Sequence, residues 1–411
     1  MCGFIGYFGK LDKSNYLDCI NEATQYLEHR GPDDSGIEYG DYYGLGFRRL
    51  SIQDLSNSGH QPMISKDKRY IILYNGEMYN FKEYRKELID NGHSLNSHSD
   101  TEVILEMYKI HGIKFIKRIN GMFSCAIIDL HKESIVLVRD RFGIKPLYYT
   151  LSDNTLFFAS EMKAFLPFVR KNLIKWSLNE DKIFEYMIFR YVSGKDTLIS
   201  RVYKLDPGHY IEYSLKDNLK IQEYYNILES TKDNSIISAD EKTLIELVHE
   251  ELKNSIKRRL ISDAPIGIAL SGGVDSSLIT AIASELTEKV NTFSIGFNEK
   301  KIGARYIDES KYSNFVAKKY STNHKHITLD EKIFSDLYLK MAWHNDEPIN
   351  FPHLPGLYLL SKHASKDVKV LLGGEGADEV FAGYNFYKNQ NVSSLNNRFA
   401  RISDINKLIN T

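Results

Sequence analysis

A glycine-containing stretch in the second half of the chain, Leu270-Ser271-Gly272-Gly273-Val274-Asp275-Ser276-Ser277, constrains the fold more than any other. It follows the apolar run 266–270 and leads into the apolar run 278–283, which predicts a strand, a glycine turn and a helix start. Adjacent glycines let backbone N–H groups approach a phosphate, and the serines add hydroxyl donors at the positive end of the helix. A Gly-Gly-x-Asp turn alone is usually an ordinary connection, but the serines and the strand favour an oxyanion site.

Strands and helices alternate around this loop, which predicts a parallel, doubly wound sheet. The expected strands are 266–270, 290–295, 326–329 and 368–372, and the expected helices are 310–320 and 331–343. Ligands of such sheets bind beyond the carboxyl ends of the strands. The segment Gly373-Gly374-Glu375-Gly376-Ala377-Asp378-Glu379 leaves the last expected strand, so it is expected to face the glycine loop. Its carboxylates suit Mg²⁺ held together with phosphate oxygens, although acidic residues also favour a solvated helix start.

The composition excludes several classes of protein. The chain has 411 residues, a formal net charge of -1 and no long basic run, so neither nucleic acid nor a membrane surface is expected as a partner. The cysteines Cys2, Cys19 and Cys125 lack metal-ligand spacing and predict neither a disulfide framework nor a zinc site. No export signal and no membrane-spanning run is found, which predicts a cytoplasmic protein that acts on small molecules.

The first part of the chain contains a second candidate reactive group, Cys2. Cys2 follows Met1, and removal of the methionine would leave a cysteine with a free α-amino group. Such an amine has a pKa of about 8 and can accept the thiol proton without a histidine, which makes the thiolate the nucleophile. Taken alone, a cysteine at this position is more often incidental.

Mixed secondary structure is expected around Cys2. The predicted helices are 17–27, 81–90 and 100–110, and the predicted strands are 48–52 and 70–74. Further strands at 123–129, 134–138, 147–150 and 156–159 are expected to form a second sheet. Asn75-Gly76 at a strand end is usually a turn, but the Asn75 amide and the Gly76 N–H can also donate together to an oxyanion. Ser99 or Asp100 is expected to cap a helix, and Asp100 is equally suited to bind an ammonium group.

Six short motifs, in this order, resemble the class II glutamine amidotransferase domain. They are Met1-Cys2-Gly3, His29-Arg30-Gly31-Pro32-Asp33, Arg49-Leu50-Ser51-Ile52, Asn75-Gly76-Glu77-Met78-Tyr79-Asn80, Ser99-Asp100-Thr101-Glu102 and Asp140-Arg141-Phe142-Gly143-Ile144-Lys145-Pro146-Leu147-Tyr148-Tyr149. The resemblance implies an αββα N-terminal-nucleophile (Ntn) hydrolase sandwich in which Cys2 attacks the side-chain amide of glutamine. It implies that Asn75 and Gly76 form the oxyanion hole. Arg49 would grip the glutamine α-carboxylate, a geometry that suits a guanidinium group. Asp100 and the main chain around Ile52 and Glu77 would hold the glutamine amine.

The glycine loop lacks the Gly-Lys-Ser/Thr of a Walker loop and the third glycine of a dinucleotide fingerprint. It resembles the pyrophosphate loop of N-type ATP pyrophosphatases, which make acyl-adenylates. With the glutaminase motifs and the stretch Gly374-Glu375-Gly376-Ala377-Asp378-Glu379-Val380-Phe381-Ala382-Gly383-Tyr384, nearly the whole chain resembles glutamine-hydrolysing asparagine synthetases. The resemblance implies ATP and Mg²⁺ as cofactors and a catalytic role for Glu375. The implied nucleotide contacts are Leu270, Ser271, Gly272, Gly273, Asp275, Ser276, Ile295, Gly373 and Gly374, and the implied Mg-pyrophosphate ligands are Asp275 and Asp378.

The polar stretch 230–240 lacks helical periodicity and is expected to be a linker. It would separate a glutaminase domain at 1–229 from an ATP pyrophosphatase-type domain at 241–411. Ser238 and Glu241 have the spacing of a capping box at the start of the second domain. The second domain is expected to be short at its C-terminus, because the acceptor-binding motif that the family carries there is not found. The family also usually has Ser where this chain has Gly373.

The expected function is glutamine-dependent, ATP-driven amidation of a carboxylate, with aspartate as the first candidate acceptor. It would proceed through an acyl-adenylate and release AMP and pyrophosphate. The stretch 346–354, where the family shapes its acceptor pocket, does not identify the acid. A surface-polysaccharide sugar acid is therefore an alternative acceptor, and a nucleotide- and glutamine-binding relative without synthetase activity is an alternative function. The oligomeric state, including a homodimer, is left open.

Overall fold

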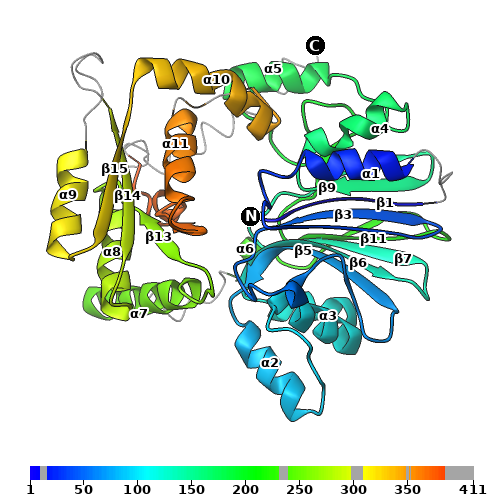
Figure 1. The fold of residues 1–411 in the computed structure, drawn as a ribbon, viewed down its shortest axis with the longest axis horizontal. Helices are drawn as coiled ribbons and strands as arrows, with labels where there is room; N and C mark the ends of the chain where they lie inside the picture. Colours follow the sequence, from blue (N-terminus) through cyan, green and yellow to red (C-terminus); the bar gives the residue numbers. More distant parts are fainter. Residues whose placement is uncertain (10–15, 231–238, 298–308, 349–350, 352, 385–411) are drawn as a thin grey trace. The chain divides into compact units, whose positions relative to one another are not determined.

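The computed structural model describes residues 1–9, 16–230, 239–297, 309–348, 351 and 353–384 (Figure 1). The chain forms two compact units, one from Met1–Ile266 and Leu329–Val370 and the other from Gly267–Thr328 and Leu371–Thr411. Most of the expected linker, 231–238, lies outside the described residues, so the boundary at 229 to 241 stays a prediction. No helix in the described ranges is both long and apolar enough to cross a bilayer.

The first unit contains two six-stranded antiparallel sheets. One has the order β10-β8-β9-β1-β3-β2, from Tyr203–Lys204, Tyr148–Ser152, Thr155–Ala159, Gly3–Phe8, Tyr43–Arg49 and Asp34–Tyr39. The other has the order β12-β11-β7-β6-β5-β4, from Lys220–Glu223, His209–Ser214, Ser134–Arg139, Gly121–Asp129, Tyr70–Met78 and Met63–Ile64. The helices of this unit are α1 (Tyr16–Gln25), α2 (Phe81–Asp90), α3 (Asp100–His111), α4 (Leu166–Arg170), α5 (Glu180–Phe189), α6 (Ile227–Ser230), α7 (Glu241–Arg259), α10 (Glu331–Asn345) and α11 (Leu354–Ala364). Short 3-10 helices lie at Asn57–Gly59, Gly112–Arg118 and Met162–Phe165.

Alternating side chains of the strands build a four-layer αββα sandwich. Every residue of β1 is buried, because Phe4 and Phe8 pack between the sheets while Ile5 and Tyr7 pack against α1. On β5, Leu73 belongs to the cluster between the sheets, and its neighbours along the strand belong to the cluster under α2 and α3. Figure 1 shows α1 on the outer face of one sheet and α2 with α3 on the outer face of the other. The predicted Ntn-hydrolase architecture is confirmed.

Two details of the predicted strands are wrong. The strands expected at 123–129, 134–138, 147–150 and 156–159 do not form one sheet: β6 and β7 pair with β5, whereas β8 and β9 join the sheet of β1. The strand expected at 48–52 ends at Arg49, because Ser51 turns away and donates its N–H to the Asp33 carboxylate at 2.8 Å. Pairing partners distant in sequence leave no local periodicity that would identify them.

The second unit is built on a four-stranded sheet of order β15-β14-β13-β16. The strands are β13 (Ile266–Ala269), β14 (Asn291–Phe297), β15 (Asn323–Leu329) and β16 (Val370–Leu372), and the helices are α8 (Val274–Leu286), α9 (Ser310–Lys319) and α12 (Ala377–Phe381). β13 and β14 pair in parallel, with Gly267 opposite Asn291. The elements alternate as expected, and the α/β fold class of this part is confirmed.

The helix before this sheet, α7, begins with a different cap from the one expected. Asp240 is the N-cap residue and accepts a hydrogen bond from the Thr243 N–H at 2.9 Å. Ser238, the expected capping residue, lies outside the described residues. Asp is as good an N-cap as Ser, and it stands directly before the first helical residue.

Candidate active sites

Cys2 is half-buried at the start of β1, where the loop after β3 meets it. The Leu50 N–H donates to the Cys2 sulfur at 3.4 Å, and the Cys2 carbonyl accepts from Arg30 Nε at 2.9 Å. Burial raises the pKa of the Cys2 thiol, although the nearby amino terminus and the Leu50 hydrogen bond oppose the shift. The thiol is therefore protonated near neutral pH and needs a base to become a nucleophile.

The amino group of Met1 lies beside this thiol. The Met1 side chain is exposed, but its amino group is enclosed, and burial lowers the pKa of that amine to about 5. The Cys2 thiol works against this shift and the Arg30 charge adds to it. An amine with such a pKa is neutral at pH 7 and can accept a proton.

Arg49 lies buried at the end of β3 and organises the loop that follows it. Its Nη1 donates to the Ser56 carbonyl at 2.8 Å, and its Nη2 donates to the Gln53 and Asp54 carbonyls. A Cβ atom at Gly59 would collide with the guanidinium group, so the glycine leaves the space that Arg49 fills. The guanidinium is held in place by main chain before any substrate arrives.

The loop after Arg49 is also tied to the segment that precedes β13. The Ile52 carbonyl accepts from the Asp263 N–H at 3.0 Å, and the Asp263 carboxylate accepts from the Asp54 N–H at 2.8 Å. Gln53 donates its side-chain amide to the Ile261 carbonyl at 2.8 Å. One lone pair of the Ile52 carbonyl is thus already used, which leaves the other for the substrate amine expected there.

Asn75 is the least satisfied polar residue of this region. It is 0% exposed, and neither its side-chain oxygen nor its side-chain nitrogen has a hydrogen-bond partner among the described residues. Leaving a buried polar group unpaired costs roughly 1–3 kcal/mol, so the arrangement demands a reason. Ser124, directly opposite on β6, has an unpaired hydroxyl too and was not expected from the sequence. The alternative of a turn at Asn75-Gly76 is excluded, because the strand expected at 70–74 continues through both residues as far as Met78.

Asp100 and Glu77 form a pair of enclosed carboxyl groups. Ser99 caps α3 by accepting the Thr101 N–H at 3.1 Å, which leaves Asp100 free to accept the Met78 N–H at 2.9 Å. Asp100 is 4% exposed, and burial raises its pKa to about 6 despite these hydrogen bonds. Burial and the Asp100 charge raise the pKa of Glu77 well above its usual range. A bound ammonium group would favour the charged form of both carboxyls.

The glycine loop of the second unit has the form of an anion site. Gly272 has φ +92°, and a Cβ atom there would lie 2.6 Å from the Ser313 nitrogen of α9. The N-cap of α8 is Gly273, which offers no side chain to the first N–H groups of the helix. Ser276 is buried, and its hydroxyl lies 3.0 Å from the Ser271 hydroxyl. N–H groups and hydroxyls gathered at a helix N-terminus are what a phosphate needs.

The segment after β16 lies against this loop, as expected from strand order. A Cβ atom at Gly374 would lie 2.9 Å from the Asp275 Cβ and 3.5 Å from the Ser276 nitrogen. Gly373 and Glu375 are exposed, while Asp378 and Ile295 are half-buried. Leu270 packs its side chain against Val316 and Ala317 in the core, so only its main chain is available to a nucleotide. Glu375, Asp378 and the nucleotide contacts keep their assigned roles as predictions.

Comparisons with known proteins identify both regions. Residues 1–225 match the family model of the glutamine amidotransferase domain, and residues 247–409 match that of asparagine synthase. The chain is 36% identical over 391 residues to asparagine synthetase [glutamine-hydrolyzing] 1 of Bacillus subtilis, covering 94% of this chain and 60% of the relative. It is 36% identical over 405 residues to putative asparagine synthetase [glutamine-hydrolyzing] 2 of Methanocaldococcus jannaschii, covering 93% and 76%. The chain belongs to the glutamine-hydrolysing asparagine synthetase family.

The sequence motifs of this asparagine synthetase family member did not assign every buried charge near Cys2. Lys145 is 4% exposed, and burial together with the Arg30 charge lowers its pKa to about 8, while Glu77 and Cys2 attract it. Glu161 is also buried and pairs with Arg30 at 2.8 Å. Charged residues inside apolar runs, such as Glu161 in the stretch 156–168, were the signal that could have revealed them.

Proposed function

We propose that this chain catalyses the glutamine-dependent, ATP-driven amidation of a carboxylate, with aspartate as the acceptor and asparagine, AMP and pyrophosphate as products. The observation that carries the proposal is the fully buried side-chain amide of Asn75, which has no partner among the described residues. Asn75 lies on β5, in the sheet that packs against the sheet of β1, the strand that follows Cys2. The family membership of both regions supports it. The chain spans 60% of the Bacillus subtilis relative's length, so the whole reaction is proposed for this chain rather than taken from that protein.

In the first half-reaction, Cys2 would attack the side-chain amide carbon of glutamine. The α-amino group of the processed Cys2 takes the thiol proton and later passes it to the departing ammonia. The oxyanion of the tetrahedral intermediate accepts hydrogen bonds from the Asn75 amide and the Gly76 N–H. Water then hydrolyses the thioester and releases glutamate. Support comes from the raised pKa of the thiol, which calls for a base.

The glutamine main-chain groups would be held by the charged residues around this thiol. Arg49 would bind the α-carboxylate with the guanidinium edge that is not bonded to the 53–56 main chain. Asp100, Glu77 and the Ile52 carbonyl would bind the ammonium group. Burial raises the pKa values of both Asp100 and Glu77, and the Asp100 charge adds to the shift of Glu77. A bound ammonium group would favour the charged forms, which supports this assignment.

In the second half-reaction, the acceptor carboxylate would attack the α-phosphate of ATP and expel pyrophosphate. Ser271, Gly272, Gly273 and Ser276 would bind phosphate oxygens through the α8 N-terminus, with Gly374 at the same loop. Asp275 and Asp378 are the carboxylates that would hold Mg²⁺, which would neutralise the charge of the leaving pyrophosphate. Glu375 would contact the reacting groups. Ammonia then attacks the acyl-adenylate and displaces AMP.

The test combines the purified full chain with glutamine, Mg-ATP and candidate acids, and mass spectrometry follows the products. We expect asparagine, AMP and pyrophosphate with aspartate. If AMP forms only with a sugar acid, that acid would replace aspartate as the proposed acceptor. No AMP with any acid, together with retained binding of ATP and glutamine, would favour a binding protein.

A Cys2→Ala variant separates the two half-reactions. It should lose glutaminase activity entirely and still make asparagine when ammonia is supplied, since the second half-reaction needs only ammonia. Cys19→Ala, which removes a buried thiol that donates to the Pro167 carbonyl, is the matched control. Glutamine hydrolysis that persists in Cys2→Ala would remove Cys2 from the scheme.

A further inference from the structure

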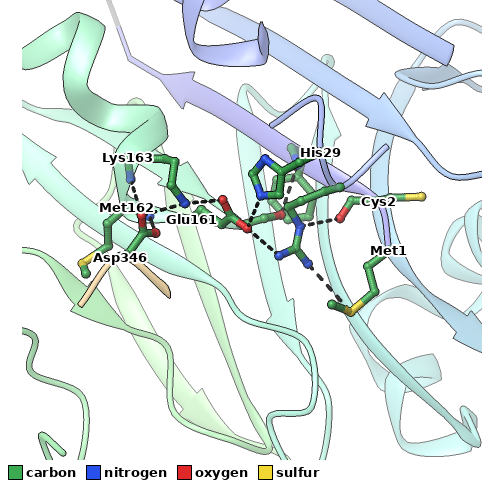
Figure 2. A network of polar contacts seen from close by, with 10 residues as sticks. Met1, Cys2, His29, Glu161, Met162, Lys163 and Asp346 are labelled. Carbon is green, nitrogen blue, oxygen red and sulfur yellow. Dashed lines mark hydrogen bonds and ion pairs between the residues drawn. The ribbon is translucent and has the colours of Figure 1, made fainter. Parts of the chain in front are cut away.

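A continuous chain of buried polar contacts leads away from Cys2 (Figure 2). Arg30 Nε donates to the Cys2 carbonyl at 2.9 Å, and Arg30 Nη1 pairs with Glu161 Oε1 at 2.8 Å. Glu161 Oε2 pairs with Lys163 Nζ at 2.5 Å, and Lys163 Nζ pairs with Asp346 Oδ1 at 2.8 Å. The chain therefore runs from the main chain of the nucleophile to Asp346 at the end of α10.

These charges are buried, and a buried charge without an ionic partner is energetically unfavourable. The side chains of Arg30 and Glu161 are each 8% exposed, that of Asp346 is 6% exposed and that of Lys163 is 2% exposed. Removing one partner of a buried ion pair is strongly destabilising, because the other charge is left uncompensated. The loss of one ion pair in this chain of contacts must therefore change the neighbouring ion pairs as well.

Glu161 pairs with two cations of this chain of contacts, Arg30 and Lys163. Burial favours its neutral form, but the hydrogen bond from His29 and the charges of Arg30 and Lys163 outweigh burial and lower its pKa to about 2. Burial instead raises the pKa of Asp346, and the Glu161 charge adds to the shift, while the Lys163 ammonium opposes it. The Lys163 ammonium is thus shared between two carboxylates. If its ion pair with Asp346 weakens, its ion pair with Glu161 becomes stronger.

The two ends of this chain of contacts, Cys2 and Asp346, belong to regions that match different family models. Arg30, Glu161 and Lys163 lie in the glutamine amidotransferase match, 1–225, whereas Asp346 lies in the asparagine synthase match, 247–409. Asp346 has φ +59° and also accepts the Met162 N–H at 2.6 Å, so its carboxylate is fixed by several donors. Its position is therefore sensitive to the backbone of α10 and of the residues that follow.

We propose that Asp346 is a positioning residue for Cys2 that acts through Lys163, Glu161 and Arg30, and through which the synthetase region sets the rate of glutamine hydrolysis. The inference rests on the proposed role of Cys2. When Asp346 withdraws from Lys163, the ammonium binds Glu161 alone and draws it from Arg30. Arg30 then loosens its hold on the Cys2 carbonyl, and the thiol loses its alignment with the substrate amide.

The test measures kcat and KM for glutamine hydrolysis in the full chain carrying Asp346→Asn, which keeps the left-handed backbone preference but removes the charge. We expect kcat to fall about tenfold with KM within about twofold, because alignment rather than substrate binding is lost. Asp129→Asn is the matched control: Asp129 is 5% exposed and pairs with Arg69 at 3.0 and 2.7 Å, outside this chain of contacts. A kcat for Asp346→Asn equal to that of the control would overturn the proposal.

A double-mutant cycle separates positioning from general destabilisation. If the contacts act as one chain, Glu161→Gln and Asp346→Asn together should lower kcat little more than Glu161→Gln alone. Independent, multiplying effects would contradict it. If Asp346→Asn does not fold, Asp346→Gly replaces it, because glycine tolerates the positive φ and removes the carboxylate, and an unchanged kcat there would also overturn the proposal. Hydrolysis surviving in Cys2→Ala would instead refute the proposed function, which keeps the two failures distinct.

Discussion

The proposed glutaminase site and the proposed phosphate-loop site differ in how far they are assembled without a substrate. In the first, the functional side chains are enclosed: Asn75, Asp100 and Arg49 are 0%, 4% and 5% exposed. In the second, Ser271, Gly373 and Glu375 are exposed, and the loop serines bond each other. The glutaminase site thus carries the cost of unpaired polar groups in advance, whereas the phosphate loop satisfies its own donors until a ligand replaces them.

The difference follows from the elements on which each site is built. Asn75 lies within β5, which pairs with β4 and β6 in its sheet. The phosphate loop connects β13 to α8, and its shape depends on Gly272 and on the serine hydroxyls. We therefore expect substitutions in the first site to change catalysis without changing the fold, and those in the second to change local structure and catalysis together.

The largest effect that tests this difference is expected for Asn75→Ala. Removing one oxyanion-hole donor typically lowers kcat by about 10²–10³-fold. Because the Asn75 amide has no partner in the described part of the protein, its loss should not lower the free energy of unfolding as the loss of a paired buried amide would. Steady-state glutaminase kinetics and urea unfolding of the same variant check both expectations. Amidation with added ammonia should stay as in the wild type.

Ser124→Ala is the matched control for that substitution. Ser124 is equally buried, has an unpaired hydroxyl and lies opposite Asn75 on β6. If it only contributes an unpaired group, its removal should leave kcat within about threefold and keep or raise stability. A fall in kcat as large as that of Asn75→Ala would make Ser124 part of the oxyanion site and would enlarge the site beyond the residues expected from the sequence.

The next effect is expected for Gly272→Ala in the phosphate loop. The added Cβ meets both the positive φ and the Ser313 nitrogen at 2.6 Å, so the loop must shift. A displacement of about 1 Å near reacting groups costs on the order of 10²-fold, and we expect that loss in kcat/KM for ATP with glutaminase activity kept. Gly92→Ala, at φ +83° with nothing within 4 Å, carries the backbone strain alone and should leave ATP turnover unchanged.

The sequence predicts both sites because their motifs are local. The strand, glycines and serines of the phosphate loop are consecutive, and the Asn75-Gly76-Glu77 motif is also a short continuous run. What the sequence does not predict is non-local: Glu161 and Arg30 are 131 residues apart, and Asp346 and Lys163 are 183 apart. The division of β6 to β9 between two sheets is non-local as well, since β9 pairs with β1, which lies far from it in the sequence. Periodicity identifies strands but not their partners.

The smallest effect concerns Asp100, whose raised pKa makes the glutaminase site sensitive to pH. Its pKa rises from 3.8 unfolded to about 6 folded, so its contribution to stability is fully present below pH 3.8 and is lost as pH rises through about 6. A shift of about 2 units corresponds to at most about 3 kcal/mol at neutral pH. Asp100→Asn keeps an acceptor for the Met78 N–H without the charge, so it should be more stable than the wild type at pH 7 and equal to it at pH 4.

The same substitution should weaken glutamine binding, because the substrate ammonium needs the charged carboxylate. We expect KM for glutamine to be about tenfold higher in Asp100→Asn. In the wild type, KM should decrease as the pH rises through about 6, and in Asp100→Asn this decrease should be absent. Unfolding curves and KM measured from pH 4 to pH 8 test both parts. A variant that is less stable at pH 7 would mean that Glu77, the coupled neighbour, holds the proton in place of Asp100, since both carboxyls share one enclosed environment.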